Sequence, residues 1–259
     1  MREINDSEWQ GRQLVAETED TLFRSGPSSD RIQVIGHRGA PAPGIAENSP
    51  AAVTRALRQG ADGVEIDVWL VGDGTLVCTH DLAGADVPSL ATLSDLLAAA
   101  QRPAGARVVV EAKPVADAAV ARATADALAG VLQTSAGSAD ITISSFDADL
   151  LATIRAACAD LPVRTALLGE KADPAAAVVR RAVRDGHDEV HLPMVAVRRS
   201  PRDVQTAREL GLSVALWTVN RRADLEWAAE LGVDAVITDD VLGARAELDR
   251  AADAVPAAA

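Results

Sequence analysis

Acidic and basic side chains of the kinds that bind phosphate and metal ions recur in two short apolar runs of the chain. Glu65 and Asp67 are two positions apart in GVEIDVWL, and Glu111 and Lys113 have the same spacing in RVVVEAK. Residues two apart on an extended strand project from the same face. Carboxylates that are buried together repel each other and are costly to ionise unless a cation lies between them. The pattern therefore predicts a cation site made by Glu65, Asp67 and Glu111.

The ligand atoms at this site indicate which ion it would take. A set of carboxylate oxygens suits Mg²⁺ or Ca²⁺ better than Zn²⁺, and the chain has no Cys or His group at zinc-site spacing. Lys113 is one of only two lysines in a chain that otherwise uses arginine. A compact ammonium group beside the acids can bind a phosphate as a point charge. We therefore expect a divalent cation and a phosphate group at the same place.

Two histidines accompany these residues. His37 and Arg38 follow an apolar run directly, and His80 ends another. Imidazole can accept and donate protons near neutral pH, which suits the attack and departure of oxygens at a phosphate. A lone histidine after a strand is nevertheless commonly a packed or solvated residue. Glu47 lies in the loop that follows His37 and adds a further carboxylate.

The other two histidines are not assigned to this chemistry. His187 is expected at the surface, because it lies beside Gly186 at the end of a helical segment. His191 lies on an apolar run and could face the interior of the fold, and we assign it no substrate role.

Short β-branched runs alternate with longer helical segments after residue 30, which predicts a succession of βα units. The predicted strands are residues 32–36, 63–70, 107–113, 141–145, 164–168, 189–193, 213–219 and 235–238. The predicted helices cover about residues 49–59, 89–100, 116–133, 147–158, 174–185, 201–210, 222–231 and 240–253. Eight such units favour an α/β fold of the (β/α)₈ TIM-barrel type, with an open, doubly wound sheet as the alternative.

One additional element interrupts this alternation. Asp73-Gly74 is a hairpin signal, and residues 75–80 form a predicted short strand that folds back on the second barrel strand. We expect a single barrel domain over residues 31–253, a flexible tail at 254–259 and an N-terminal extension at 1–30. An apolar stripe in that extension could form a docked helix; it consists of Leu14, Val15, Leu22 and Phe23.

Composition narrows the class of partner. The net charge of −13 disfavours binding to nucleic acid or to anionic membranes, and an aromatic content of 2% leaves little material for base stacking. No run is long enough to insert stably in a membrane. Cys78 and Cys158 fit no disulfide framework, which favours a reduced, cytoplasmic protein. The expected partner is a small-molecule phosphodiester, and the oligomeric state is left open.

Residues 37–81 contain HRGAPAPGIAENSPAAV followed by GADGVEIDVWLVGDGTLVCTHD. This stretch resembles the signature of the glycerophosphodiester phosphodiesterase family, which combines His-Arg-Gly, Glu-Asn, Glu-(Ile/Leu)-Asp-Val and His-Asp in that order. The similarity continues through the later runs VEAKP (110–114), ISSFDADLL (143–151), ALWTVN (215–220) and VDAVITD (233–239).

The resemblance implies roles for the residues above. Glu65, Asp67 and Glu111 would bind the divalent cation, and His37 and His80 would act as the acid–base pair. Arg38 and Lys113 would hold the phosphate, and Glu47 would assist the metal or the substrate. Trp217 would line the pocket, although it could equally be a core residue. The implied reaction is hydrolysis of a glycerophosphodiester to glycerol 3-phosphate and an alcohol.

The chain departs from the family pattern after His-Asp. Members usually carry a longer segment there, whereas only LAGADVP (82–88) intervenes in this sequence. We therefore expect a short form with an open pocket. Two other functions stay open: a phospholipase D-like activity on lysolipids on the related barrel, and a catalytically silent phosphate-binding barrel.

Overall fold

The computed structural model describes residues 31–101, 105–135 and 140–254, and within them nine strands form one sheet. Eight strands are parallel, and β1 pairs with both β9 and β2, so these eight close into a barrel. The predicted (β/α)₈ barrel is therefore confirmed, and the open-sheet alternative is wrong. The expected helix within residues 1–30 and the tail at 255–259 lie outside the described residues.

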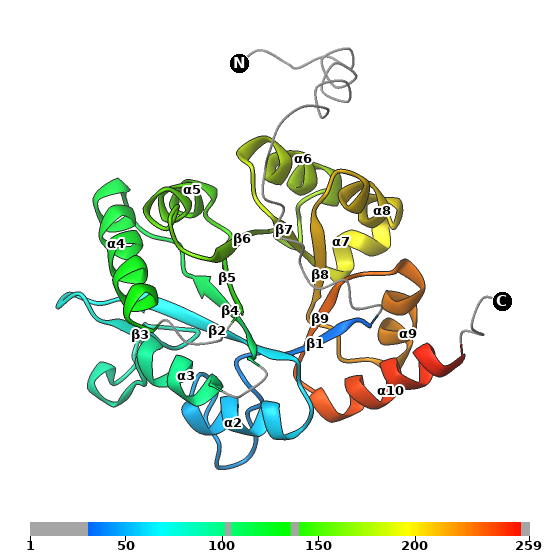
Figure 1. Ribbon diagram of the computed structural model, residues 1–259, viewed down its shortest axis with the longest axis horizontal. Coiled ribbons are helices and arrows are strands. Elements are labelled where there is room, and N and C mark those ends of the chain that lie inside the picture. Colours follow the sequence, from blue (N-terminus) through cyan, green and yellow to red (C-terminus); the bar gives the residue numbers. More distant parts are fainter. Residues whose placement is uncertain (1–30, 102–104, 136–139, 255–259) are drawn as a thin grey trace. The chain divides into compact units, whose positions relative to one another are not determined.

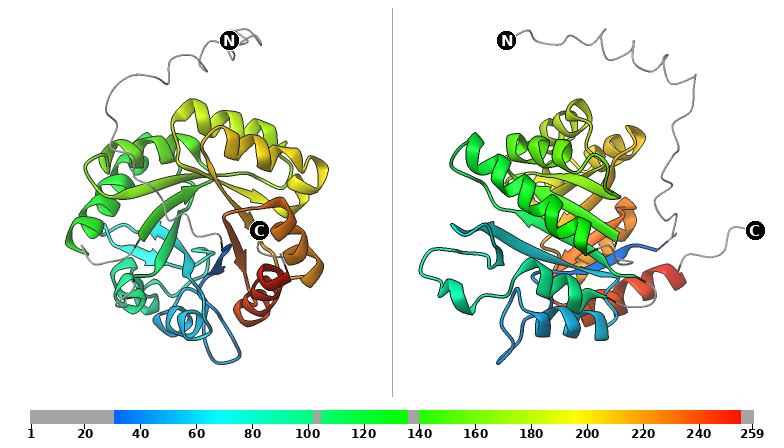
Figure 2. Two further views of the ribbon diagram at one scale, coloured as in Figure 1. Left: turned by 45° about the vertical axis from the view of Figure 1, so that its right-hand side comes forward. Right: turned by 60° about the vertical axis from the view of Figure 1, so that its left-hand side comes forward.

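The barrel strands agree closely with the sequence prediction. In chain order they are β1 (Gln33–Gly36), β2 (Gly63–Leu70), β4 (Arg107–Ala112), β5 (Asp140–Ser145), β6 (Val163–Leu168), β7 (Glu189–Pro193), β8 (Ser213–Trp217) and β9 (Ala235–Thr238). Figure 1 shows the strands as a ring and the helices around it, and Figure 2 shows the same arrangement from two other sides.

Helices follow the strands and cover the outside of the ring (Figure 1). They are α2 (Pro50–Arg58), α3 (Leu93–Ala100), α4 (Ala118–Thr134), α5 (Ala148–Ala157), α6 (Ala175–Asp185), α7 (Met194–Arg199), α8 (Arg202–Glu209), α9 (Arg222–Leu231) and α10 (Val241–Ala254). Local signals define several ends. The Ser49 hydroxyl accepts a hydrogen bond from the amide of Ala52, with Pro50 in the first turn of α2. Gly186 closes α6 with φ of 74°, in the left-handed region.

One helix was not predicted, and another begins later than predicted. Helix α7 was not predicted, because its six residues, MVAVRR, are too few to show a helical period and contain two valines that favour strands. Helix α3 begins at Leu93 rather than near residue 89. Thr92 caps it by a reciprocal capping box with Asp95, while Val87–Ser89 form a separate 3₁₀ turn.

The predicted hairpin is present beside β2. Strand β3 (Leu76–Cys78) is antiparallel to β2, with Val68 opposite Cys78. The turn places Gly74 at φ of 86°, a conformation that favours glycine. The hairpin carries the chain back along β2 from Leu70 toward Val68, and His80 follows two residues after Cys78.

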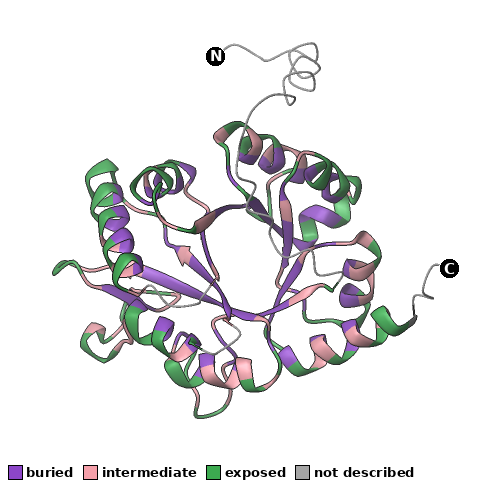
Figure 3. Ribbon diagram, viewed as in Figure 1, coloured by how far each residue is buried: buried purple, intermediate pink, exposed green. Residues whose placement is uncertain are grey.

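The strands are buried on both faces, as Figure 3 shows by the colour of the ring. Val34, Val64 and Val236 pack outward between the ring and the helices, whereas Ile35, Val109 and Ile237 belong to a small apolar cluster inside the barrel. This arrangement explains why the strands read as nearly continuous apolar runs rather than alternating ones.

Ionic side chains occupy the interior near the N-terminal ends of the strands. Glu189, at the start of β7, pairs with Arg107 and with Arg164, and all three belong to strands of the ring. His191 is fully buried and its Nε2 lies 3.1 Å from the Glu189 carboxylate. Burial alone would raise the pKa of Glu189, but Arg107 and His191 outweigh it and hold that pKa well below its usual range.

The expectation that His187 is a surface residue is wrong. Its side chain is 5% exposed, and its Nδ1 lies 3.0 Å from the hydroxyl of Thr165. Gly186 does end the helix, but the chain then turns inward to enter β7, so His187 packs beneath that turn. None of the helices in the described part of the chain combines the length and apolarity needed to cross a bilayer.

Candidate active site

Several of the predicted site residues lie at the C-terminal ends of barrel strands, where (β/α)₈ enzymes have their active sites. His37 follows β1, Glu65 and Asp67 lie on β2, and Glu111 lies on β4. The strand register places Asp67 directly beside Glu111. The alternation of each strand directs these side chains into the barrel, as the sequence spacing indicated.

Glu65, Asp67 and Glu111 form a compact acidic cluster. One carboxylate oxygen from each lies within 4.8 Å of the others. Glu65 and Asp67 are 4% and 1% exposed. Burial, with repulsion from Asp67 and Glu111, raises the pKa of Glu65 well above its ordinary value.

The two oxygens of Glu65 differ in their contacts. Oε2 accepts a hydrogen bond of 2.9 Å from the backbone amide of Arg38, whereas Oε1 is buried and has no hydrogen-bond partner among the described residues. A buried carboxylate oxygen without a partner, facing two other carboxylates, fits a cation ligand. The donor set is made of oxygens only, which suits Mg²⁺ or Ca²⁺.

Lys113 neutralises part of this cluster. Its ammonium group lies 2.5 Å from Asp67 Oδ1 and 2.5 Å from Glu111 Oε1. Burial would lower the pKa of Lys113, but the two carboxylates outweigh it and raise that pKa. The pKa of Glu111 is itself raised, because its burial outweighs the attraction to Lys113. The ammonium group therefore stays charged beside the acids, where it can also reach an anionic ligand.

Arg38 connects the acidic cluster to the loop after β1. Its guanidinium donates a hydrogen bond of 2.8 Å to Glu47 Oε2, and its Nε lies 3.6 Å from Asp67 Oδ2. The backbone turns sharply here, with φ of 53° at Arg38 and 82° at Gly39. A Cβ at position 39 would approach the backbone of Ala52 to 2.7 Å, so the His-Arg-Gly sequence requires glycine at its third position.

Asn48 is a site residue to which the sequence analysis assigned no function. It is buried, has φ of 51° and binds Asp67 twice through its side-chain amide. Asparagine tolerates the left-handed region better than most residues, so its place after Glu47 in a turn was an available signal. No local pattern, however, indicated that its partner would be Asp67 on the next strand.

Asp239 is a second residue without a predicted role. It follows β9, and its Oδ1 lies 2.6 Å from Nδ1 of His37. The hydrogen bond from His37 lowers the pKa of Asp239, so the carboxylate is ionised at neutral pH. Closure of the barrel was the available signal, because it makes the last strand a neighbour of the first.

His80 follows the short strand β3 by two residues. The imidazole Nδ1 lies 3.1 Å from Asp81, and the backbone is held by the Trp69 indole, which donates 3.1 Å to the carbonyl of Thr79. The side chain of His80 is 39% exposed, so solvent and small molecules can reach it.

Trp217 is partly exposed at the end of β8 and packs against the apolar cluster inside the barrel. Its ring meets Phe146 edge-on at 5.7 Å, and its indole nitrogen donates 3.2 Å to the carbonyl of His191. The ring of Trp217 is thus packed against the interior of the barrel and is only partly exposed.

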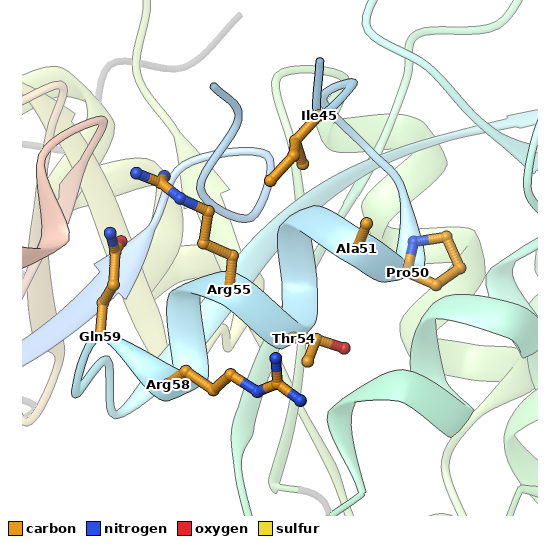
Figure 4. A pocket seen from close by; sticks show the side chains of 7 residues that line it. All are labelled: Ile45, Pro50, Ala51, Thr54, Arg55, Arg58 and Gln59. Atoms are coloured by element: carbon orange, nitrogen blue, oxygen red, sulfur yellow. The ribbon is translucent and has the colours of Figure 1, made fainter. Parts of the chain in front are cut away.

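A separate open hollow lies on the outer surface beside α2. Its lining comes from α2, including Arg55 and Arg58, and from Ile45 in the preceding loop (Figure 4). None of the predicted site residues lines it. The Arg55 guanidinium donates a hydrogen bond of 2.8 Å to the carbonyl of Ala40.

The geometry agrees with a match to a known protein family. The model of the glycerophosphoryl diester phosphodiesterase family matches residues 37–98 and 82–242. These segments together cover most of the chain and include the residues described above. The chain belongs to this family.

A curated relative matches this chain over a short stretch. The "Probable glycerophosphodiester phosphodiesterase 1" of Mycobacterium tuberculosis is 48% identical over 69 residues. The aligned stretch covers 24% of this chain and 25% of the relative. The aligned stretch therefore spans about a quarter of the length of this relative.

Solved structures support the fold over a longer span. A glycerophosphodiester phosphodiesterase from Parabacteroides distasonis has a TM-score of 0.75 and 24% identity, with 87% of this chain and 100% of that chain covered. An Oleispira antarctica phosphodiesterase, solved in complex with the product sn-glycerol-3-phosphate, has a TM-score of 0.68 and 22% identity over 86% and 98% of the two chains. At these identities the likeness shows the barrel architecture.

Proposed function

We propose that this member of the glycerophosphoryl diester phosphodiesterase family hydrolyses glycerophosphodiesters to glycerol 3-phosphate and an alcohol with the help of a divalent cation. The observation that carries the proposal is the buried, unpartnered Oε1 of Glu65, which lies with Asp67 and Glu111 between the cationic groups of Arg38 and Lys113. Family membership and the glycerol 3-phosphate bound to a structural relative support the substrate class.

In this proposal Glu65, Asp67 and Glu111 hold the cation. Mg²⁺ and Ca²⁺ both prefer carboxylate oxygens, and a bound divalent cation would neutralise charge on the phosphoryl oxygens. Lys113 and Arg38 bind the same phosphate group as fixed positive charges. Lys113 directly follows β4 and Arg38 follows β1 by two residues, so the two cationic groups reach the acidic cluster from different strands.

The two histidines move the protons. His37 accepts a proton from the attacking water molecule, and His80 donates a proton to the oxygen of the departing alcohol. One phosphorus–oxygen bond forms and one breaks, so the phosphodiester becomes a phosphomonoester and a free alcohol. Both imidazoles have their Nδ1 near a carboxylate, which leaves Nε2 of each available for the substrate.

The short segment after Asp81 bears on substrate size. Between Asp81 and the 3₁₀ turn at Val87–Ser89 the chain has only five residues, most of them partly or fully exposed. We infer that no subdomain covers the site at this point and that the alcohol portion of the substrate extends into solvent. Glycerophosphodiesters with different small headgroups are then all acceptable.

A substrate screen tests the proposal. The full chain is incubated with glycerophosphocholine, glycerophosphoethanolamine and lysophosphatidylcholine, each with EDTA, Mg²⁺ or Ca²⁺. Glycerol 3-phosphate and the released choline or ethanolamine are both measured. We expect release from the first two substrates with a divalent cation and none with EDTA. Turnover of lysophosphatidylcholine alone would contradict the proposal and favour a lysolipid activity.

Matched lysine variants connect the activity to this site. Lys113→Met removes the buried ammonium group, and we expect a loss of at least roughly 10²-fold in kcat/KM, the scale of removing one electrostatic contact in an active site. Lys171→Met is the control, because Lys171 is the chain's other lysine and its side chain is exposed. Equal activity of the two variants would place the reaction elsewhere.

A further inference from the structure

We propose that Asp239, held in place by Asn220, is a positioning residue that fixes the tautomer and the ring orientation of His37. The expected effect of Asp239 on catalysis rests on the proposed function. The orientation of the ring is a property of the protein itself, and it can be measured without substrate or metal.

The contact between the two side chains determines which imidazole nitrogen carries the proton. Nδ1 of His37 lies 2.6 Å from Oδ1 of Asp239. An ionised carboxylate can only accept hydrogen bonds, so Nδ1 must be the donor. The neutral ring then has an unprotonated Nε2, which is the nitrogen able to accept a proton.

Asp239 is itself immobilised by its neighbours. Nδ2 of Asn220 donates a hydrogen bond of 2.6 Å to Oδ2 of Asp239. The backbone amide of Asp239 in turn donates a hydrogen bond of 2.9 Å to Oδ1 of Asn220. The Thr238 hydroxyl donates to the same Asn220 oxygen at 3.1 Å. The asparagine amide is therefore held from two directions, and both carboxylate oxygens of Asp239 have partners.

The backbone ties this network to His37. The amide of His37 donates 2.8 Å to the carbonyl of Thr238, and β1 pairs with β9 over its whole length. His37, Thr238 and Asp239 thus lie where the first and last barrel strands meet. The backbone hydrogen bonds that close the barrel therefore bring Asp239 next to His37, and the Asp239 side chain holds the imidazole.

His80 has no comparable support. Its carboxylate partner is the adjacent residue Asp81, whose side chain is 82% exposed and whose Oδ2 lies 3.1 Å from Nδ1. An exposed side chain on a loop has many accessible rotamers, so it restrains the imidazole weakly. The two histidines therefore differ in preorganisation, and His37 is the one whose proton position is set before substrate arrives. An orienting carboxylate of this kind has a large effect where a histidine acts as a general base.

The decisive measurement is the tautomer of His37 in the metal-free protein. The chain has four histidines, so long-range ¹H–¹⁵N spectra are simple, and His37→Gln assigns the signal. We expect the neutral His37 ring to carry its proton on Nδ1, whereas free imidazole side chains favour Nε2. In Asp239→Asn we expect the signal to move toward the Nε2-protonated form. A wild-type ring protonated on Nε2 would overturn the inference.

Kinetics provide the second arm. We expect Asp239→Asn to lower kcat by roughly 10²-fold with KM within about threefold, because a general base contributes about 10²- to 10⁴-fold. Asn220→Ala frees the carboxylate without removing it and should lower kcat by roughly tenfold. The charge-matched control is Asp160→Asn, an exposed residue before β6.

The outcomes separate the two proposals. An unchanged kcat in Asp239→Asn would show that the carboxylate does not position the base, and would overturn the inference. Wild-type protein that hydrolyses no glycerophosphodiester would instead contradict the proposed function, and the tautomer of His37 would still decide the role of Asp239.

Discussion

Asn48 and Asp67 are joined by two hydrogen bonds that cross from the loop after β1 to β2. The Asn48 amide Nδ2 donates 2.8 Å to Asp67 Oδ2, and the Asp67 backbone amide donates 2.9 Å to Asn48 Oδ1. The amide of Asn48 therefore fixes the carboxylate that contacts Lys113 and lies beside Glu111. It also satisfies a buried backbone donor on a barrel strand.

Asn48 should consequently contribute to stability in two separable ways. Asn48→Gly removes the two hydrogen bonds but allows φ of 51°, and we expect a loss of about 1–3 kcal/mol in the free energy of unfolding. Asn48→Ala adds the cost of the left-handed conformation, about 1 kcal/mol more. Urea denaturation of the metal-free protein measures both, and equal stabilities of the two variants would contradict the backbone contribution.

Divalent cations should stabilise the protein more at high pH than at low pH. The pKa values of Glu65 and Glu111 are raised, so these groups hold protons that a cation must displace. We expect Mg²⁺ or Ca²⁺ to raise Tm at pH 8 and to have a smaller effect at pH 5, with protons released on binding. Differential scanning fluorimetry at the two pH values tests this, and a Tm rise independent of pH would exclude Glu65 and Glu111 as the ligands.

Substitution of the individual carboxylates should separate their roles in stability. Glu65→Gln removes a negative charge that the neighbouring carboxylates repel, and Oε1 of Glu65 has no hydrogen-bond partner in the described structure. We therefore expect the free energy of unfolding of the metal-free protein to increase by roughly 1 kcal/mol. Asp67→Ala leaves Lys113 and Asn48 without their shared partner and should cost about 3 kcal/mol. Both variants should lose the Tm rise with cations. Similar destabilisation by the two substitutions would contradict the proposed difference.

Acid should destabilise the protein through two buried histidines. Burial lowers the pKa of His187 and of His191 in the folded protein, so the unfolded chain binds more protons below about pH 6.5. The free energy of unfolding should therefore decrease as the pH falls from 7 to 5. In His191→Gln this decrease should be smaller. A pH dependence unchanged by the substitution would show that His191 does not titrate on unfolding.

Strand periodicity was sufficient to predict the barrel and the acidic cluster. Glu65 and Asp67 alternate with apolar residues on one strand, and Glu111 lies on a strand that must be its neighbour, so spacing alone brought three carboxylates together. Strand spacing could not predict the contacts of Asp239 and Asn48. Asp239 meets His37 across 202 positions of sequence, and only closure of the ring makes them neighbours.

The errors have similar physical causes. His187 follows a glycine that ends a helix, which suggested exposure, but its burial depends on Thr165 from another strand. Helix α7 depends on the packing of Met194, Ala196 and Val197 against the barrel, because its own sequence has little helical preference. Local sequence patterns did not contain the tertiary contacts that bury His187 and stabilise α7.

The ionic cluster around Glu189 determines whether small molecules can pass through the barrel. Arg107, Glu189 and His191 are almost completely inaccessible and occupy the interior behind the acidic residues. Side chains therefore fill the barrel interior behind the acidic cluster. In the proposed reaction, substrate and products would enter and leave at the C-terminal ends of the strands.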